Sequence, residues 1–245
     1  MHACFRFYAE LNDHLPAEQQ FQTLEKQFVV PSTVKDMLES FGVPHAEVEF
    51  ILANGTPVDF SYLVQDGDRI AVYPVFESLD ITPELRVRRE PLREPKFVLD
   101  VHLGKLAAVL RMLGFDSVYC SSASDAELVR ISCKERRILL TRDRGLLKHN
   151  AVTHGYWIRE TGSRHQAVEV IARFDLKRRV RPFTRCMACN RLLDPVDRMN
   201  VKERVPEGVW QRFSEFWQCH GCGRVYWRGS HYQRMLRKIE ELTSS

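Results

Sequence analysis

Two Cys-x-x-Cys pairs constrain this chain more than any other feature of its sequence. Cys186 and Cys189 form the first pair, Cys219 and Cys222 form the second, and 29 residues separate the two pairs. Each such turn presents two sulfurs, so the two turns together supply the four thiolates that tetrahedral zinc requires. Disulfides are the alternative, and a reducing compartment disfavours them. We therefore predict a structural zinc site with no open position for catalysis.

Hydropathy and the first residues predict a cytoplasmic protein without a membrane partner. No run of 18 or more apolar residues is present, so no membrane-spanning helix is expected. Residues 1–6 lack the basic-then-apolar layout of a secretory signal. The three other cysteines (Cys4, Cys120 and Cys133) fall in apolar stretches and are predicted to be core residues.

Charge is distributed unevenly along the chain. Residues 1–78 hold 4 Lys and Arg but 12 Asp and Glu, a net charge of −8, whereas residues 79–245 carry a net charge of +12. A basic body favours a polyanionic partner for that part of the chain. Two ordinary solvated surfaces explain the same charges, so the charge alone does not decide between these interpretations.

Residues 1–78 predict a compact α+β domain. Strand patterns at 3–8, 25–30, 50–53 and 69–74 surround a helix that begins near Val34. The stretch FILANGTPVDFSYLVQDGDRIAVYPVFESLD resembles a β-grasp, ubiquitin-like domain of the sulfur-carrier type. Such carriers end in Gly-Gly, but this chain has Phe76-Glu77-Ser78 there and continues. A docking or substrate-positioning domain is therefore expected, and its acidic surface offers a site for a protein partner.

Residues 79–95 are rich in proline and arginine and predict a charged linker. The residues that follow it, 96–175, predict a parallel sheet. Strand patterns alternate with helical ones, and in such α/β units the helices cover the faces of the sheet. Acids follow the strands: Asp100 ends the first, Asp125 begins the helix after the second, and Asp143 lies two residues beyond the third. Ligands bind at this carboxyl edge of a parallel sheet. Three converging carboxylates would repel one another unless Mg²⁺ or Mn²⁺ neutralised them.

Each of these acids also has a purely structural interpretation. Asp125 could simply complement a helix N-terminus, and Asp143 could shape a turn. Asp100 is harder to explain in this way, because an acid that ends an apolar strand risks burial without a partner. Three neighbouring cations (Lys105, Arg142 and Arg144) would either hold a phosphate or balance the local charge.

Several motifs together resemble the Mut-seven C-terminal RNase family. They are FVLDVHLGKLAAVLRMLGFD, RILLTRDRGLLK and CMACN with CHGCGRVYWRGSHYQRM. The resemblance implies a PIN-like nuclease domain at 96–175, a zinc ribbon with a basic tail at 176–245, and the N-terminal ubiquitin-like domain that members often carry. It also implies a metal-dependent ribonuclease in which Asp100 and Asp143 match the metal-binding acids. Asp125 is the candidate for the middle acid, with Asp116 and Glu127 as rivals.

The basic ribbon and tail predict contact with RNA. Cations supply affinity for phosphate, and exposed aromatic side chains stack on single-stranded bases. Trp217, Tyr226 and Trp227 could instead pack into the small core of the ribbon. The principal alternative to a nuclease is a non-catalytic RNA-binding or adaptor protein that retains the PIN-like fold.

Overall fold

The computed structural model describes residues 1–74 and 95–244, so most of the predicted linker lies outside the described residues. Among the described residues, two compact units are distinguished. The first contains residues 1–74 and 125–157, and the second contains residues 95–124 and 158–244.

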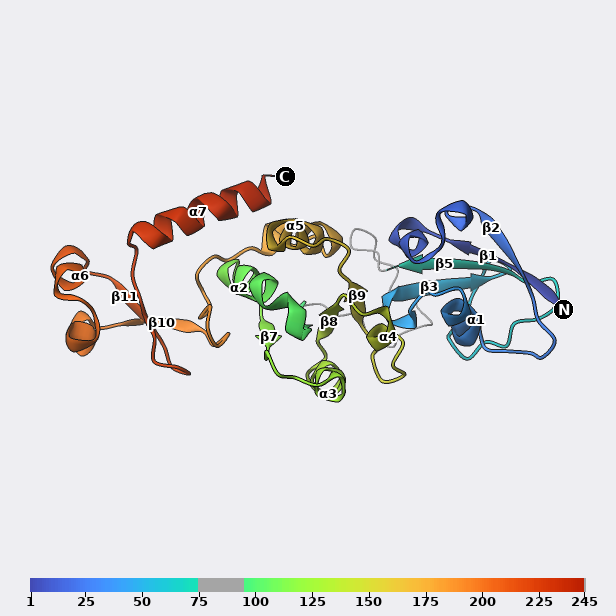
Figure 1. Ribbon diagram of the computed structural model, residues 1–245, viewed down its shortest axis with the longest axis horizontal. Coiled ribbons are helices and arrows are strands. Elements are labelled where there is room, and N and C mark those ends of the chain that lie inside the picture. The colour runs from blue at the N-terminus through green and yellow to red at the C-terminus, as the bar shows by residue number, and fades with distance from the viewer. Residues whose placement is uncertain (75–94, 245) are drawn as a thin grey trace. The chain divides into compact units, whose positions relative to one another are not determined.

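A five-stranded sheet in the order β2-β1-β5-β3-β4 forms the N-terminal part of the first unit (Figure 1). Strand β1 pairs parallel to β5, and the other neighbouring strands pair antiparallel. The bounds are β1 His2–Phe7, β2 Thr23–Gln27, α1 Val34–Ser40, β3 Val48–Ala53, β4 Thr56–Pro57 and β5 Arg69–Pro74, with short 3₁₀ helices at Ala9–His14, Ala17–Gln19 and His45–Glu47.

Alternating burial explains this sheet. Ala3, Phe5 and Phe7 of β1 point into the core, and β5 buries every second residue in the same way. Thr33 caps α1 by accepting a hydrogen bond from the Asp36 amide.

The first unit also holds a second group of elements from later in the chain. They are α3 Asp125–Glu135, β8 Ile138–Thr141, α4 Arg144–Leu147 and β9 Gly155–Trp157. Strands β8 and β9 pair parallel, as predicted, and all four residues of β8 are buried. A continuous apolar strand of this kind is typical of a parallel sheet covered on both faces.

The second unit begins with a parallel strand pair and a helix. Strands β6 Phe97–Leu99 and β7 Ser117–Tyr119 pair parallel, with a 3₁₀ turn at Val101–Leu103 and α2 Gly104–Met112 between them. Helix α5 Ser163–Arg173 packs against α2.

The ribbon completes the second unit. Its antiparallel sheet has the order β10-β11-β12, formed by Leu193–Val196, Phe216–Cys219 and Val225–Tyr226. Val201, Val205 and Phe216 form its small core. Its helices are 3₁₀ turns at Lys177–Arg179 and Arg198–Arg204, α6 Glu207–Arg212 and α7 Ser230–Thr243.

Two sequence interpretations need correction. The segment interpreted only as a basic tail contains α7, which packs against α5 (Figure 1). Cys120 and Cys133 are exposed and are not core residues. In the described part of the chain, no helix is both long and apolar enough to cross a membrane.

Candidate metal centre and nuclease residues

The four predicted zinc ligands lie together in the ribbon. Cys186 and Cys189 precede β10, Cys219 ends β11, and Cys222 lies in the turn before β12. The Sγ atoms lie within 4.8 Å of one another, with Cys186 and Cys222 at 3.5 Å and Cys189 and Cys219 at 3.3 Å. Four sulfurs ~2.3 Å from one zinc ion are about 3.8 Å apart. The cluster can therefore hold a tetrahedral metal ion such as zinc.

Hydrogen bonds prepare the cluster for metal. The Tyr226 hydroxyl lies 3.1 Å from the Cys186 sulfur. Burial acts to raise the pKa of the Cys186 thiol, but hydrogen bonds from Tyr226 and from the amides of Cys189 and Ala188 outweigh it and lower this pKa to about 6. Since the thiolate is the metal-binding form, these contacts favour coordination by Cys186 at neutral pH, whereas burial raises the pKa of the Cys189 thiol to about 12.

Arg111 connects helix α2 to the first Cys-x-x-Cys turn, a role that sequence reasoning missed. Its side chain is buried and donates to the carbonyls of Met187 and Ala188 at 3.1 and 3.0 Å, and to that of Ser117 at 2.8 Å. Burial lowers the pKa of Arg111, but an arginine remains charged at neutral pH. This cation therefore offsets part of the negative charge of four thiolates. The sequence signal that could have revealed this role is an arginine among the buried apolar residues of α2.

Asp116, a rival for the middle acid, is engaged with the ribbon instead. Its Oδ2 lies 3.3 Å from Arg185, and its Oδ1 accepts from Asn190 at 2.8 Å. The side-chain Oδ1 of Asn190 in turn accepts from the Ser117 amide at 2.9 Å. With both carboxylate oxygens occupied, Asp116 fits a structural role in joining α2 and β7 to the ribbon.

Asp100 lies where the sequence predicts, directly after a fully buried strand. Strand β6 ends at Leu99, and Asp100 is only 7% exposed. Its carbonyl accepts from the Leu103 amide at 2.9 Å and starts the 3₁₀ turn before α2. A buried carboxylate at the carboxyl end of a parallel strand is suited to hold a hard divalent cation, because it offers oxygen ligands and gains from charge neutralisation.

Asp125 and Asp143 belong to the first unit. Asp125 is the exposed first residue of α3. Asp143 is the N-cap of α4, where its Oδ1 accepts from the Gly145 amide at 2.7 Å. This bond supports the turn-forming interpretation and leaves a second, exposed oxygen on the same carboxylate. Asp100 belongs to the second unit, so the convergence of the three acids stays a prediction.

The three predicted phosphate-binding cations are all exposed. Lys105 lies in the first turn of α2, and Arg142 and Arg144 flank Asp143. The Arg144 guanidinium carbon lies 4.4 Å from the centre of the Trp157 ring, and one of its nitrogens donates to the His14 carbonyl at 3.4 Å. Arg144 is thus partly committed to packing.

The N-terminal domain contacts the segment that carries Asp143. His14 and Glu47 form a buried pair at 3.0 Å, and the other Glu47 oxygen accepts from the Trp157 amide at 2.7 Å. Lys148 donates to the Glu39 carbonyl at 3.0 Å. These contacts place a buried carboxylate from the N-terminal domain on the end of β9. Residues 1–74 are therefore part of the structural environment of Asp143.

Comparison with known proteins agrees with this architecture. Residues 95–239 match a family described as the Mut7-C RNAse domain, and residues 1–80 match one described as Mut7-C ubiquitin. No curated protein and no solved structure gives a significant match. The two matches confirm the predicted order of a ubiquitin-like domain followed by a Mut7-C RNAse domain, and the structure shows parallel α/β elements and a four-cysteine cluster within the latter.

Proposed function

The chain belongs to the Mut7-C RNAse family, and on this basis we propose that it is a metal-dependent ribonuclease that cuts RNA at an acidic Mg²⁺ or Mn²⁺ site. The observation that carries the proposal is the match over residues 95–239, together with the buried Asp100 at the end of β6. In this proposal the protein acts in the cytoplasm and has RNA as its partner.

Asp100, Asp125 and Asp143 are the proposed ligands of the divalent ion. When bound, the ion stabilises the charge that develops on the phosphodiester and lowers the pKa of a bound water. The three carboxylates would hold the ion, and the carboxylate of Asp143 is itself oriented by the Gly145 amide. Water is the nucleophile in this scheme, because the motifs that carry the proposed site contain no recognisable Ser-His-Asp triad.

Lys105 and Arg142 are the proposed phosphate-binding residues. Both side chains are exposed. Lys105 follows Asp100 closely in the sequence, and Arg142 directly precedes Asp143. Arg144 could add a further contact to phosphate, but it would have to leave the Trp157 ring to do so. We therefore assign Arg144 the smaller contribution of the three.

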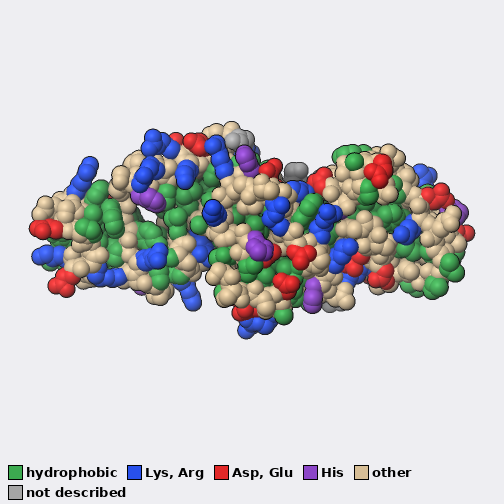
Figure 2. All heavy atoms as spheres, in the orientation of Figure 1, with side chains coloured by type: hydrophobic (Ala, Val, Ile, Leu, Met, Phe, Trp, Pro, Cys, Tyr) green, Lys and Arg blue, Asp and Glu red, His purple; other side chains and the backbone are tan. Residues whose placement is uncertain are grey.

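The ribbon has two proposed roles, to hold a structural zinc ion and to bind RNA. The four cysteines supply the zinc ligands. Exposed cations of α7 (Arg234, Arg237 and Lys238) supply affinity for phosphate, and basic side chains gather over α5 and α7 in Figure 2. The N-terminal domain is proposed to support the Asp143 segment and to offer its acidic surface to a protein partner.

Cleavage of single-stranded RNA by the purified protein tests the proposal. We expect brief EDTA treatment to abolish cleavage, and Mn²⁺ or Mg²⁺ to restore it, because hard cations exchange at a carboxylate site. The ribbon zinc should be retained, which metal analysis of the treated protein will check. Cleavage that continues in EDTA would contradict the metal-dependent mechanism. RNA binding without cleavage in any divalent ion would favour the alternative of an adaptor protein.

A further inference from the structure

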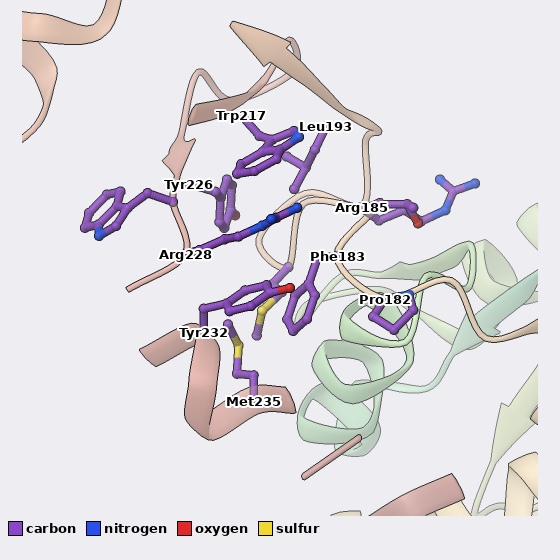
Figure 3. A pocket seen from close by; sticks show the side chains of 12 residues that line it. Pro182, Phe183, Arg185, Leu193, Trp217, Tyr226, Arg228, Tyr232 and Met235 are labelled. Carbon is purple, nitrogen blue, oxygen red and sulfur yellow. The ribbon is translucent and has the colours of Figure 1, made fainter. Parts of the chain in front are cut away.

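The ribbon contains a cavity that neither the metal centre nor the nuclease residues use. Its volume is about 260 Å³, and it lies between the β10-β11-β12 sheet, residues 182–185 and α7 (Figure 3). The side chains that define it are Phe183, Trp217, Tyr226, Arg228, Tyr232 and Met235. An apolar cavity of about 150 Å³ is enough to hold a benzene ring. This cavity therefore has room for one flat aromatic base.

The two faces of the ribbon sheet have different environments. Trp217 pairs with Tyr226 across β11 and β12, so both side chains project from one face. That face lines the cavity. The opposite face carries Phe216 and Val225, which pack in the core of the ribbon. Trp217 and Tyr226 therefore do not pack in the ribbon core, whereas Trp227 does pack against it.

Helix α7 divides its apolar stripe in a similar way. Ile239 and Leu242, in its C-terminal half, are buried, and the helix packs on α5. Met235 and Tyr232, one and two turns earlier on the same face, are only half-buried and line the cavity. The helix is thus anchored by one half of its stripe, and the other half is left to contact a ligand.

A planar group already lies between the rings. The Arg228 guanidinium carbon is 5.0 Å from the Trp217 ring centre and 6.0 Å from the Tyr232 ring centre (Figure 3). The Arg228 side chain also pairs with Glu215 at 3.4 Å, but both side chains are exposed and this ion pair is therefore weak. Phe183 has a left-handed φ of 59° and places its ring 4.5 Å from that of Tyr232. Strained backbone of this kind is often found at ligand sites.

The charge around the cavity selects the class of ligand. Residues 176–245 contain 15 Lys and Arg against 7 Asp and Glu, so the surroundings favour an anion. A quaternary ammonium group, which aromatic cages also bind, would be repelled by Arg228. A nucleotide meets both requirements, since its base stacks on aromatic rings or on a guanidinium plane and its phosphate pairs with arginine.

We propose that this cavity binds one unstacked base of single-stranded RNA, held between Trp217 and Tyr232, with Arg228 stacking on it or pairing with its phosphate. The proposal rests on the proposed function, because it takes RNA as the ligand. It adds a defined contact for a single base, formed by residues other than the candidate acids.

Paired tryptophan variants test the site. Trp217 and Trp210 are both half-buried in the ribbon, and each has an arginine over its ring, but only Trp217 lines the cavity. Binding of a labelled eight-nucleotide RNA is measured by fluorescence anisotropy, without added divalent ion so that no cleavage intervenes. Trp217→Leu should weaken binding about tenfold, as expected for loss of one base–aromatic stack. Trp210→Leu should bind like the unaltered protein.

A second variant covers the case in which Trp217→Leu does not fold, as judged by its zinc content and thermal unfolding. Tyr232→Ala, at a half-buried position of α7, should also weaken binding, and Tyr232→Phe should keep the affinity of the unaltered protein because the ring is kept. Equal affinities for Tyr232→Ala and the unaltered protein would overturn the proposal, as would equal losses in both tryptophan variants. If the cavity variants alone lose RNA binding but the unaltered protein never cuts RNA, the ribonuclease proposal fails and the base site stands.

Discussion

Asp100→Asn is expected to abolish most RNA cleavage while leaving the protein folded. The two side chains have nearly the same shape, so the buried position after β6 can accept the change. The amide has no negative charge and is a poor ligand for Mg²⁺ or Mn²⁺, whose catalytic effect is worth several kcal/mol. The rate of cleavage at saturating RNA should therefore fall roughly 100-fold or more.

Asp116→Asn is the matched control for this experiment. Asp116 lies in the same unit, but its carboxylate pairs with Arg185 and Asn190, so this change should affect stability more than the rate of cleavage. Asp143→Asn should resemble Asp100→Asn, and Asp125→Asn should have a smaller effect because its side chain is exposed at the start of a helix. The assignment fails if folded Asp100→Asn cuts RNA at the rate of the unaltered protein.

Cys219→Ser is expected to remove zinc and to unfold the ribbon. Cys219 is fully buried at the end of β11, the middle strand of the ribbon sheet. Its replacement removes one of the four zinc ligands. Binding of a structural zinc ion contributes on the order of 10–16 kcal/mol to small modules, so partial loss of it exceeds the stability of so small a core. Metal analysis should give about one zinc ion per unaltered chain and little or none in the variant.

Cys120→Ser provides the comparison for this variant, since Cys120 is exposed and lies outside the cluster. It should retain zinc and the thermal stability of the unaltered protein. Arg111 gives a further consequence of zinc loss. When the ribbon of Cys219→Ser unfolds, the hydrogen bonds from Arg111 to the Met187 and Ala188 carbonyls should be lost as well. Purified protein that contains no zinc and pairs all four cysteines as disulfides would refute the metal centre.

Local patterns predicted the cysteine cluster and most strands. The spacing of the two Cys-x-x-Cys pairs was sufficient because each turn fixes two sulfurs on its own. Strand β5 has the predicted bounds, Arg69–Pro74, because its alternation reflects one buried face and one exposed face. The positions of Asp100 and Asp143 after their strands followed from the same periodicity.

Features that depend on a partner far along the chain were not predicted. The apolar stripe of α7, which runs through Tyr232, Met235 and Ile239, is visible in the sequence but was obscured by the surrounding arginines. The pairing of Arg111 with a turn 76 residues away cannot be read from either segment alone. The same holds for Trp217 and Trp227, because only the pairing of the ribbon strands decides which ring packs against the ribbon core.

A crystal of the unaltered protein soaked in Mn²⁺ tests most directly the central claim that three acids from separate strand ends hold one divalent site. The anomalous signal of manganese locates the ion without assumptions about the protein. We expect a peak within coordination distance of Asp100, Asp125 and Asp143, and separate from the zinc of the four cysteines. A fully occupied manganese ion elsewhere, or the three carboxylates on different faces of the sheet, would contradict the assignment.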